Sequence, residues 1–241
     1  MDVVWDMETE DPDDFLTLLL LCGHPGVRLK AVTIYPGTPE QVGLVRHALD
    51  WFESEIPVGA FDPGCSQQAV SPWHYRAYGK IGPSFDVAPA EEVLLNHCDA
   101  QTTLITGAPL HNLIAALKIP AFHIGRWVCQ GGFAGEGVVP SRDQLAQFAG
   151  YSTCPTYNLS ASPPAVVSAL NDERIGTRRF VGKNVCHGVV YDPAHSRRTR
   201  PRLLRSGASS SPGSDWGERR IARPAQPGCA RPSAPPVLPS P

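Results

Sequence analysis

The stretch of this sequence best suited to chemistry is an acidic turn close to its start. A short apolar run ends at Asp6, and six carboxylate side chains fall within nine residues: Asp6, Glu8, Glu10, Asp11, Asp13 and Asp14. Carboxylates crowded in this way repel one another unless a cation neutralises them or a proton is shared, and hard oxygen donors favour Ca²⁺ or Mg²⁺. The spacing therefore predicts a metal-binding or catalytic site, although a helix start by itself also attracts one or two acids.

This acidic turn, residues 6–14, is expected to join a buried strand to a helix. Residues 3–6 are apolar and β-branched, which is typical of a parallel strand, and an apolar helix is expected from Phe15 onward. Asp11 or Asp13 would be the N-cap of this helix, with Pro12 in its first turn. Because open α/β sheets bind ligands at the carboxyl ends of their strands, the acidic turn would lie where ligands bind.

The rest of the chain continues the alternation of strand and helix. Strands are expected at 27–34, 56–60, 102–107 and 127–133, and one more strand with a polar cluster is expected within 179–192. Helices are expected at 40–52, 90–98, 108–117 and 165–170. This order predicts an α/β fold with a doubly wound, mostly parallel sheet and helices on both faces. Residues 62–89 are rich in Gly, Pro, Ser and aromatics, and we expect them to form a long loop over the site.

The composition narrows the classes of protein that this chain can be. With 241 residues, 42% of them hydrophobic, it can form one sizeable core. A net charge of −2 gives no long-range attraction for nucleic acid or an anionic membrane. The apolar run 15–21 is too short to span a bilayer and follows acids rather than a basic region. Seven scattered cysteines without a CxxC pair indicate reduced thiols in a cytoplasmic protein.

The composition changes from about Pro193. Residues 193–241 are dominated by Pro, Arg and Ser and show little apolar patterning. Such a segment cannot bury enough surface to offset the entropy of ordering it, so we expect it to be disordered. The sequence therefore predicts an α/β domain at 1–192 and a tail at 193–241.

The acidic turn resembles the N-terminal signature of the nucleoside hydrolases, the inosine-uridine-preferring N-ribosidases. Their pattern is Asp-x-Asp, a short turn and Asp-Asp at a helix start, to which Asp6-Met7-Glu8 and Asp13-Asp14 are similar. Glu8 stands where the family usually has a second Asp, and the turn is one residue longer. Later stretches resemble the family in the right order, namely Thr106-Gly107, Gly131-Gly132 and Asn158.

The resemblance implies hydrolysis of the N-glycosidic bond of ribonucleosides by a water that Ca²⁺ activates. It implies that Asp6 is both general base and metal ligand. Asp14 would be a bidentate ligand, and Thr106 would bind the metal through its main-chain carbonyl oxygen. The expected cofactor is therefore Ca²⁺.

The resemblance also implies the residues that hold a small-molecule nucleoside substrate, in purine or pyrimidine salvage. Asp13 would bind a ribose hydroxyl, and Asn158 matches a sugar-binding Asn. Thr38 stands near the place of another family Asn that contacts the ribose. His74 lies where the family has a substrate-covering loop, and its ring could stack on a base.

Two alternatives remain open. The family has a late His-Asp pair whose Asp completes the Ca²⁺ shell, and no such pair follows residue 192. The chain could therefore be a truncated, non-catalytic relative with a partial metal or nucleoside site, and its exposed apolar surface would favour association with itself. The other alternative is a phosphatase of the haloacid-dehalogenase type, with Asp6 as nucleophile, Glu8 as acid and Lys183 near the phosphate.

Overall fold

The computed structural model describes residues 1–189, and the expected tail at 193–241 lies outside them. Seven strands form one parallel sheet in the order β4-β3-β2-β1-β5-β6-β7. They are β1 Asp2–Met7, β2 Arg28–Ile34, β3 Val58–Ala60, β4 Ala88–Pro89, β5 Thr103–Thr106, β6 Ile124–Gln130 and β7 Ile175–Val181. Strands β2, β3 and β4 follow one another from β1 to one edge of the sheet, and β5, β6 and β7 follow from β1 to the other edge. The doubly wound parallel sheet is therefore confirmed.

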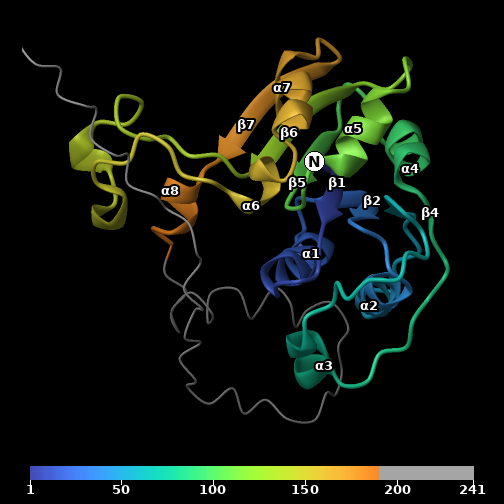
Figure 1. Cartoon of the computed structure of the whole chain (residues 1–241). Coiled ribbons are helices and arrows are strands. Elements are labelled where there is room, and N and C mark those ends of the chain that lie inside the picture. The colour runs from blue at the N-terminus through green and yellow to red at the C-terminus, as the bar shows by residue number, and fades with distance from the viewer. Residues whose placement is uncertain (190–241) are drawn as a thin grey trace, which may run out of the picture.

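Helices cover both faces of the sheet. They are α1 Asp13–Gly23, α2 Pro39–Asp50, α3 Pro72–Tyr78, α4 Ala90–His97, α5 His111–Leu117, α6 Tyr157–Ser160, α7 Pro163–Asn171 and α8 Lys183–Cys186. Figure 1 shows α1 and α2 on one side of the sheet and α4, α5 and α7 on the other. Within residues 1–189, every helix is too short or too polar to cross a membrane.

The central strand β1 is buried on both faces, which explains its continuous apolar sequence. Trp5 and Met7 belong to a core cluster with residues of α1 and α2. Val4 points to the opposite face and joins a second cluster with residues of α4 and α5. Since side chains alternate along a strand, Asp6 faces the same side as Val4.

The start of α1 differs from the sequence prediction. Pro12, not Asp11 or Asp13, is the N-cap residue, and no side chain caps the helix there. Asp13 is the first helical residue. The Asp14 Oδ2 atom accepts a hydrogen bond from the Glu8 main-chain N–H (3.0 Å), so this carboxylate serves the acidic turn rather than the helix end.

The predicted long loop at 62–89 is wrong in part, because it contains α3 and β4. The Ser71 hydroxyl caps α3 by accepting from the Trp73 N–H (3.4 Å). Rings of α3 then pack on Phe15 of α1, with centroid separations of 5.2 Å to His74 and 5.1 Å to Tyr78. Aromatic residues of the stretch that was expected to be a loop therefore pack against α1 and hold this segment on it.

Candidate functional site

The acidic turn lies where the strand order of the sheet reverses. Strands β1 and β5 are neighbours in the sheet although three other strands separate them in the chain. Asp6 pairs with Thr106 across this boundary and with Thr33 on the other side. In doubly wound sheets this switch point, at the carboxyl ends of the strands, is where ligands bind.

Asp6 is held almost completely out of solvent, with 1% exposure. Its Oδ1 atom accepts hydrogen bonds from the Thr33 hydroxyl and the Asn112 side-chain amide, both at 2.7 Å. Its Oδ2 atom is buried without a hydrogen-bond partner among residues 1–189. Burial raises the pKa of Asp6 to about 7, although both hydrogen bonds act to lower it.

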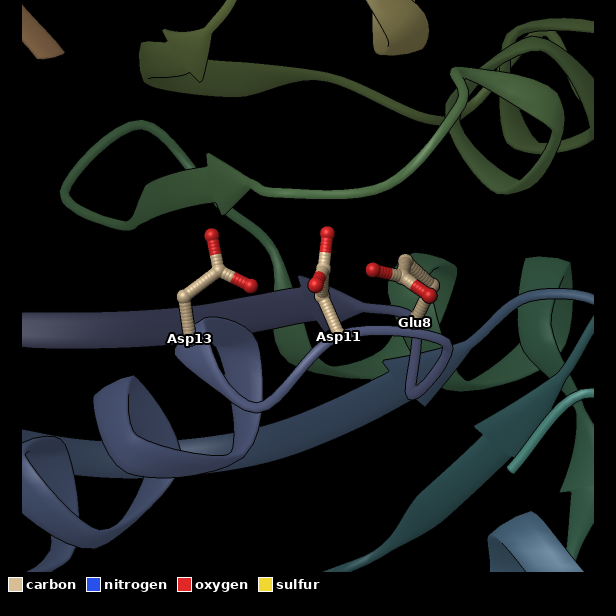
Figure 2. A group of neighbouring side chains, drawn as sticks. All are labelled: Glu8, Asp11 and Asp13. Atoms are coloured by element: carbon tan, nitrogen blue, oxygen red, sulfur yellow. The ribbon is translucent and has the colours of Figure 1, made fainter. Parts of the chain in front are cut away.

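Three carboxylates of the acidic turn come together beyond the carboxyl end of β1. Glu8, Asp11 and Asp13 each offer a carboxylate oxygen, and these atoms lie within 4.8 Å of one another. Figure 2 shows the three side chains rising on the same side of the turn. Asp11 and Asp13 are exposed, whereas Glu8 is buried. Burial first, and then its acidic neighbours, raise the pKa of Glu8 to about 7.

Asp14 connects this cluster to the end of β5. Its carboxylate is buried, and burial raises its pKa well above the usual range. Gly107, the residue after Thr106, donates its main-chain N–H to the Asp6 carbonyl oxygen (2.7 Å). A Cβ atom on Gly107 would lie 2.4 Å from Asp14 Oδ1 and 2.5 Å from the Trp5 ring. The structure therefore brings Asp6, Asp14 and Thr106 together.

Replacing Gly107 with alanine is expected to lower the free energy of unfolding by about 1 to 3 kcal/mol, because the added methyl group displaces the Asp14 carboxylate. Urea denaturation measures this change. Gly82→Ala is the matched control, since a Cβ atom there meets nothing within 4 Å. Equal stability of the two variants would contradict the close approach of Asp14 to Gly107.

The acidic turn is fastened to the protein through Thr9, which is fully buried. The Thr9 hydroxyl donates to the Ala69 carbonyl oxygen (2.7 Å) and accepts from the Gln41 side-chain amide (3.0 Å). His74 Nε2 lies 3.2 Å from the Thr9 carbonyl oxygen. Burial lowers the pKa of His74, so its ring is neutral at pH 7 and donates this hydrogen bond.

Gln41 joins two turns of the site. Its Oε1 atom accepts from the main-chain N–H groups of Gly37 (2.9 Å) and Thr38 (3.1 Å). Its amide nitrogen donates to the Thr9 hydroxyl and to the Tyr35 carbonyl oxygen, both at 3.0 Å. The acidic turn and the β2–α2 turn are therefore fixed relative to each other.

Replacing Gln41 with leucine is expected to lower the free energy of unfolding by about 2 to 4 kcal/mol, because several buried polar groups lose their partner. Chemical denaturation measures the loss. The exposed Gln101 offers a matched control, and Gln101→Leu is expected to change stability by less than about 0.5 kcal/mol. A Gln41→Leu protein as stable as this control would refute the role of the network.

Asn158 lies at the carboxyl end of β6, at the same edge of the sheet. Its side-chain amide donates to the Gln130 carbonyl oxygen (3.0 Å) and to Gln130 Oε1 (2.7 Å). Its own Oδ1 atom is buried without a partner among the described residues. The adjacent Tyr157 hydroxyl donates to Glu10 Oε2 (3.2 Å), which links α6 to the acidic turn.

Two candidates for substrate contacts occupy buried positions. Thr38 is fully buried, and its hydroxyl accepts from the Gln41 N–H (3.2 Å) as part of the capping box of α2. His74 is also fully buried and packs beneath the acidic turn. Both side chains support turns of the site. Their contact with a substrate remains a prediction.

We compared the chain with known protein families, curated proteins and solved structures. No family model matches the chain. An uncharacterized protein of Aquifex aeolicus is 25% identical over 197 residues, a match that covers 79% of this chain and 66% of that protein. The chain thus spans about two thirds of the length of this relative.

Three solved structures of nucleoside hydrolases match a larger share of this chain than the Aquifex aeolicus protein does. The inosine-uridine preferring nucleoside hydrolase of Bacillus anthracis has a TM-score of 0.57 at 18% identity, with 86% of this chain and 76% of that chain covered. A plant nucleoside hydrolase has a TM-score of 0.61 at 18% identity, with 86% and 70% covered. An inosine-guanosine nucleoside hydrolase has a TM-score of 0.55 at 16% identity, with 85% and 72% covered.

The chain has the nucleoside hydrolase fold. Within this fold, the burial of Asp6 argues against the phosphatase alternative, which requires Asp6 as an accessible nucleophile. The Lys183 ammonium, which that alternative places near a phosphate, donates instead to the Pro155 carbonyl oxygen (3.0 Å).

Sequence reasoning missed several residues of the acidic site. It left the role of Glu8 open and considered Asp11 as a helix cap, whereas both belong to the carboxylate cluster. It also did not foresee that Thr33 and Asn112 bind Asp6. The six acids were the signal for the cluster. The sequence contains no comparable signal for hydrogen bonds between residues so far apart in the chain.

Proposed function

We propose that this protein hydrolyses the N-glycosidic bond of ribonucleosides at the acidic turn, with Ca²⁺ as the cofactor. The observation that carries the proposal is the convergence of Asp6, Glu8, Asp13 and Asp14 at the switch point of a nucleoside hydrolase fold. The natural setting of this reaction would be nucleoside salvage in the cytoplasm.

The residues of the acidic turn fit a hard divalent cation. Three carboxylates lie within 4.8 Å of one another, and the buried Asp6 Oδ2 atom has no partner in the described part of the chain. Oxygen donors of this kind and number suit Ca²⁺. Asp6, Asp14 and the Thr106 carbonyl would hold the cation from the sheet side, and Glu8 from the turn. When bound, a divalent cation neutralises these charges and lowers the pKa of a coordinated water.

We propose that Glu8, rather than Asp6, accepts the proton of the attacking water. A general base must reach a water molecule, and the Glu8 carboxylate faces the exposed Asp11 and Asp13 side chains. The Asp6 carboxylate is only 1% exposed, and one of its oxygens already accepts two hydrogen bonds. Asp6 would then orient the site rather than take the proton.

The other residues would bind the sugar. Asp13 is exposed at the start of α1, where its carboxylate can accept hydrogen bonds from ribose hydroxyls. Asn158 has a side-chain oxygen without a partner among residues 1–189, which can accept another. Holding the ribose between these two groups would fix its anomeric carbon relative to Glu8.

The test is the release of free ribose from inosine, adenosine, uridine and cytidine by the full chain in the presence of Ca²⁺. We expect release from at least one nucleoside. Asp14→Ala should abolish it, and Asp50→Ala should not, because Asp50 is an exposed acid at the end of α2. Folded protein that releases no ribose from any of the four nucleosides would overturn the proposal.

A further inference from the structure

The Asp6 carboxylate is held by two side chains that come from different elements of the fold. Its Oδ1 atom accepts from the Thr33 hydroxyl of β2 and from the Asn112 side-chain amide of α5, both at 2.7 Å. Thr33 and Asn112 are both fully buried, and Thr33 pairs with Asp6 in the register of the sheet. We call Thr33 and Asn112 the Asp6 brace.

The Asn112 amide is fixed in the orientation in which its nitrogen faces Asp6. The same nitrogen donates to the main-chain carbonyl oxygen of Ile34 (3.2 Å), the residue after Thr33. Both partners of this nitrogen are acceptors, so an amide turned over would set its oxygen against two other oxygens. Asn112 is therefore anchored on β2 as well as on Asp6, and the Asp6 brace joins β1, β2 and α5 at one point.

The two hydrogen bonds of the Asp6 brace fall on the same carboxylate oxygen. The other oxygen, Oδ2, is buried and has no hydrogen-bond partner in the part of the chain that the structure describes. A carboxylate that served only the fold would have both oxygens satisfied, because an unsatisfied buried polar atom lowers stability. The asymmetry indicates that Oδ2 is kept for a ligand.

The surroundings of Asp6 indicate that this ligand is a cation. Gly107 donates its main-chain N–H to the Asp6 carbonyl oxygen (2.7 Å), and a Cβ atom on Gly107 would lie 2.4 Å from Asp14 Oδ1. A second buried carboxylate therefore lies in the same small region. Within residues 1–189, neither Asp6 nor Asp14 forms an ion pair with a basic side chain. Oxygen ligands of this kind suit a hard divalent cation.

We propose that Thr33 and Asn112 are positioning residues for the cation of the acidic turn, because by occupying Oδ1 they hold the Asp6 carboxylate with Oδ2 left as its cation-binding atom. Side chains that hydrogen-bond a metal ligand restrict its orientation, and their loss typically weakens metal binding by about tenfold to a hundredfold. This inference rests on the proposed function for the presence of the cation, but it does not require that the bound cation supports hydrolysis.

The experiment measures the dissociation constant of Ca²⁺ for the full chain by isothermal titration calorimetry. Thr33→Val keeps the shape of the side chain and removes its hydroxyl, and Asn112→Leu removes the amide in the same way. Each should weaken Ca²⁺ binding by about tenfold to a hundredfold. Thr33→Ser keeps the hydroxyl and should bind Ca²⁺ within a few-fold of the wild-type chain. Thr103→Val is the matched control, because Thr103 is a buried strand threonine whose hydroxyl contacts Arg126 rather than Asp6.

Thermal melting of each variant separates a binding defect from a folding defect. A loss of packing alone would lower the melting temperature of Thr33→Ser and leave its Ca²⁺ affinity unchanged. Because the two donors are removed in separate proteins, a variant that does not fold leaves the other as the test.

The proposal is overturned if the wild-type chain does not bind Ca²⁺, or if a folded Thr33→Val or Asn112→Leu protein binds it as tightly as Thr103→Val. Failure of the proposed function looks different, because no nucleoside would then release ribose although Ca²⁺ binding still depended on the Asp6 brace.

Discussion

Replacing Glu8 with glutamine is expected to slow ribose release from inosine by about a hundredfold to ten-thousandfold, the usual contribution of a general base. Glutamine keeps the size of the side chain and an oxygen that can accept from the Glu10 N–H. It removes the charge that takes up the proton of the attacking water. Measurement of kcat at saturating inosine and Ca²⁺ gives the size of the effect.

Glu10→Gln is the matched control for this experiment. Glu10 is exposed and lies in the same turn, and a glutamine oxygen can still accept from the Tyr157 hydroxyl. We expect kcat of this variant to stay within a few-fold of the wild-type value. A Glu8→Gln protein with wild-type kcat would return the role of the base to Asp6, where the sequence analysis placed it.

The protein without a divalent cation is expected to lose stability as the pH rises from about 4 to 7. The pKa values of Asp6 and Glu8 are raised from 3.8 and 4.5 to about 7 in the folded state. The folded protein therefore binds more protons than the unfolded chain in this window, and the free energy of unfolding must fall with increasing pH. Because one pKa unit corresponds to about 1.4 kcal/mol, the loss should reach several kcal/mol.

Chemical denaturation at pH 5 and pH 7.5, in the presence of a chelator, measures this dependence. Adding Ca²⁺ should stabilise the protein more at pH 7.5 than at pH 5, because a cation neutralises the same carboxylates that protons neutralise at low pH. Asp6→Asn should flatten the profile of the chelated protein. Stability that rises between pH 5 and pH 7.5 in chelator would contradict the burial of these acids.

The sequence was sufficient to predict the α/β fold class and the central strand β1, because the pattern that marks β1 involves only residues that are neighbours in the chain. A continuous apolar run followed by acids indicates a central parallel strand that ends at a ligand site, and the structure has β1 in the middle of the sheet. The position of the acidic turn could be estimated in the same way. The strand bounds could not, because β4 was not expected and the last described strand is Ile175–Val181, with the helix Lys183–Cys186 where the strand was expected to continue.

The organisation of the site could not be predicted in this way. Asp6 is held by Asn112, which lies 106 residues later, and no pattern in the sequence connects the two. His74 was expected in a loop over the substrate, but its ring packs on Phe15 beneath the acidic turn. His111 and Tyr35 were likewise separate residues until the fold stacked their rings.

The most direct test of a cation-dependent site at the acidic turn is ribose release from the best nucleoside before and after chelation. The full chain is assayed as purified, then after treatment with a chelator, and finally after Ca²⁺ is restored. We predict that chelation abolishes ribose release and that Ca²⁺ recovers it, with no recovery in the Asp14→Ala protein. Release of ribose at an undiminished rate in excess chelator would contradict the proposed role of the carboxylates.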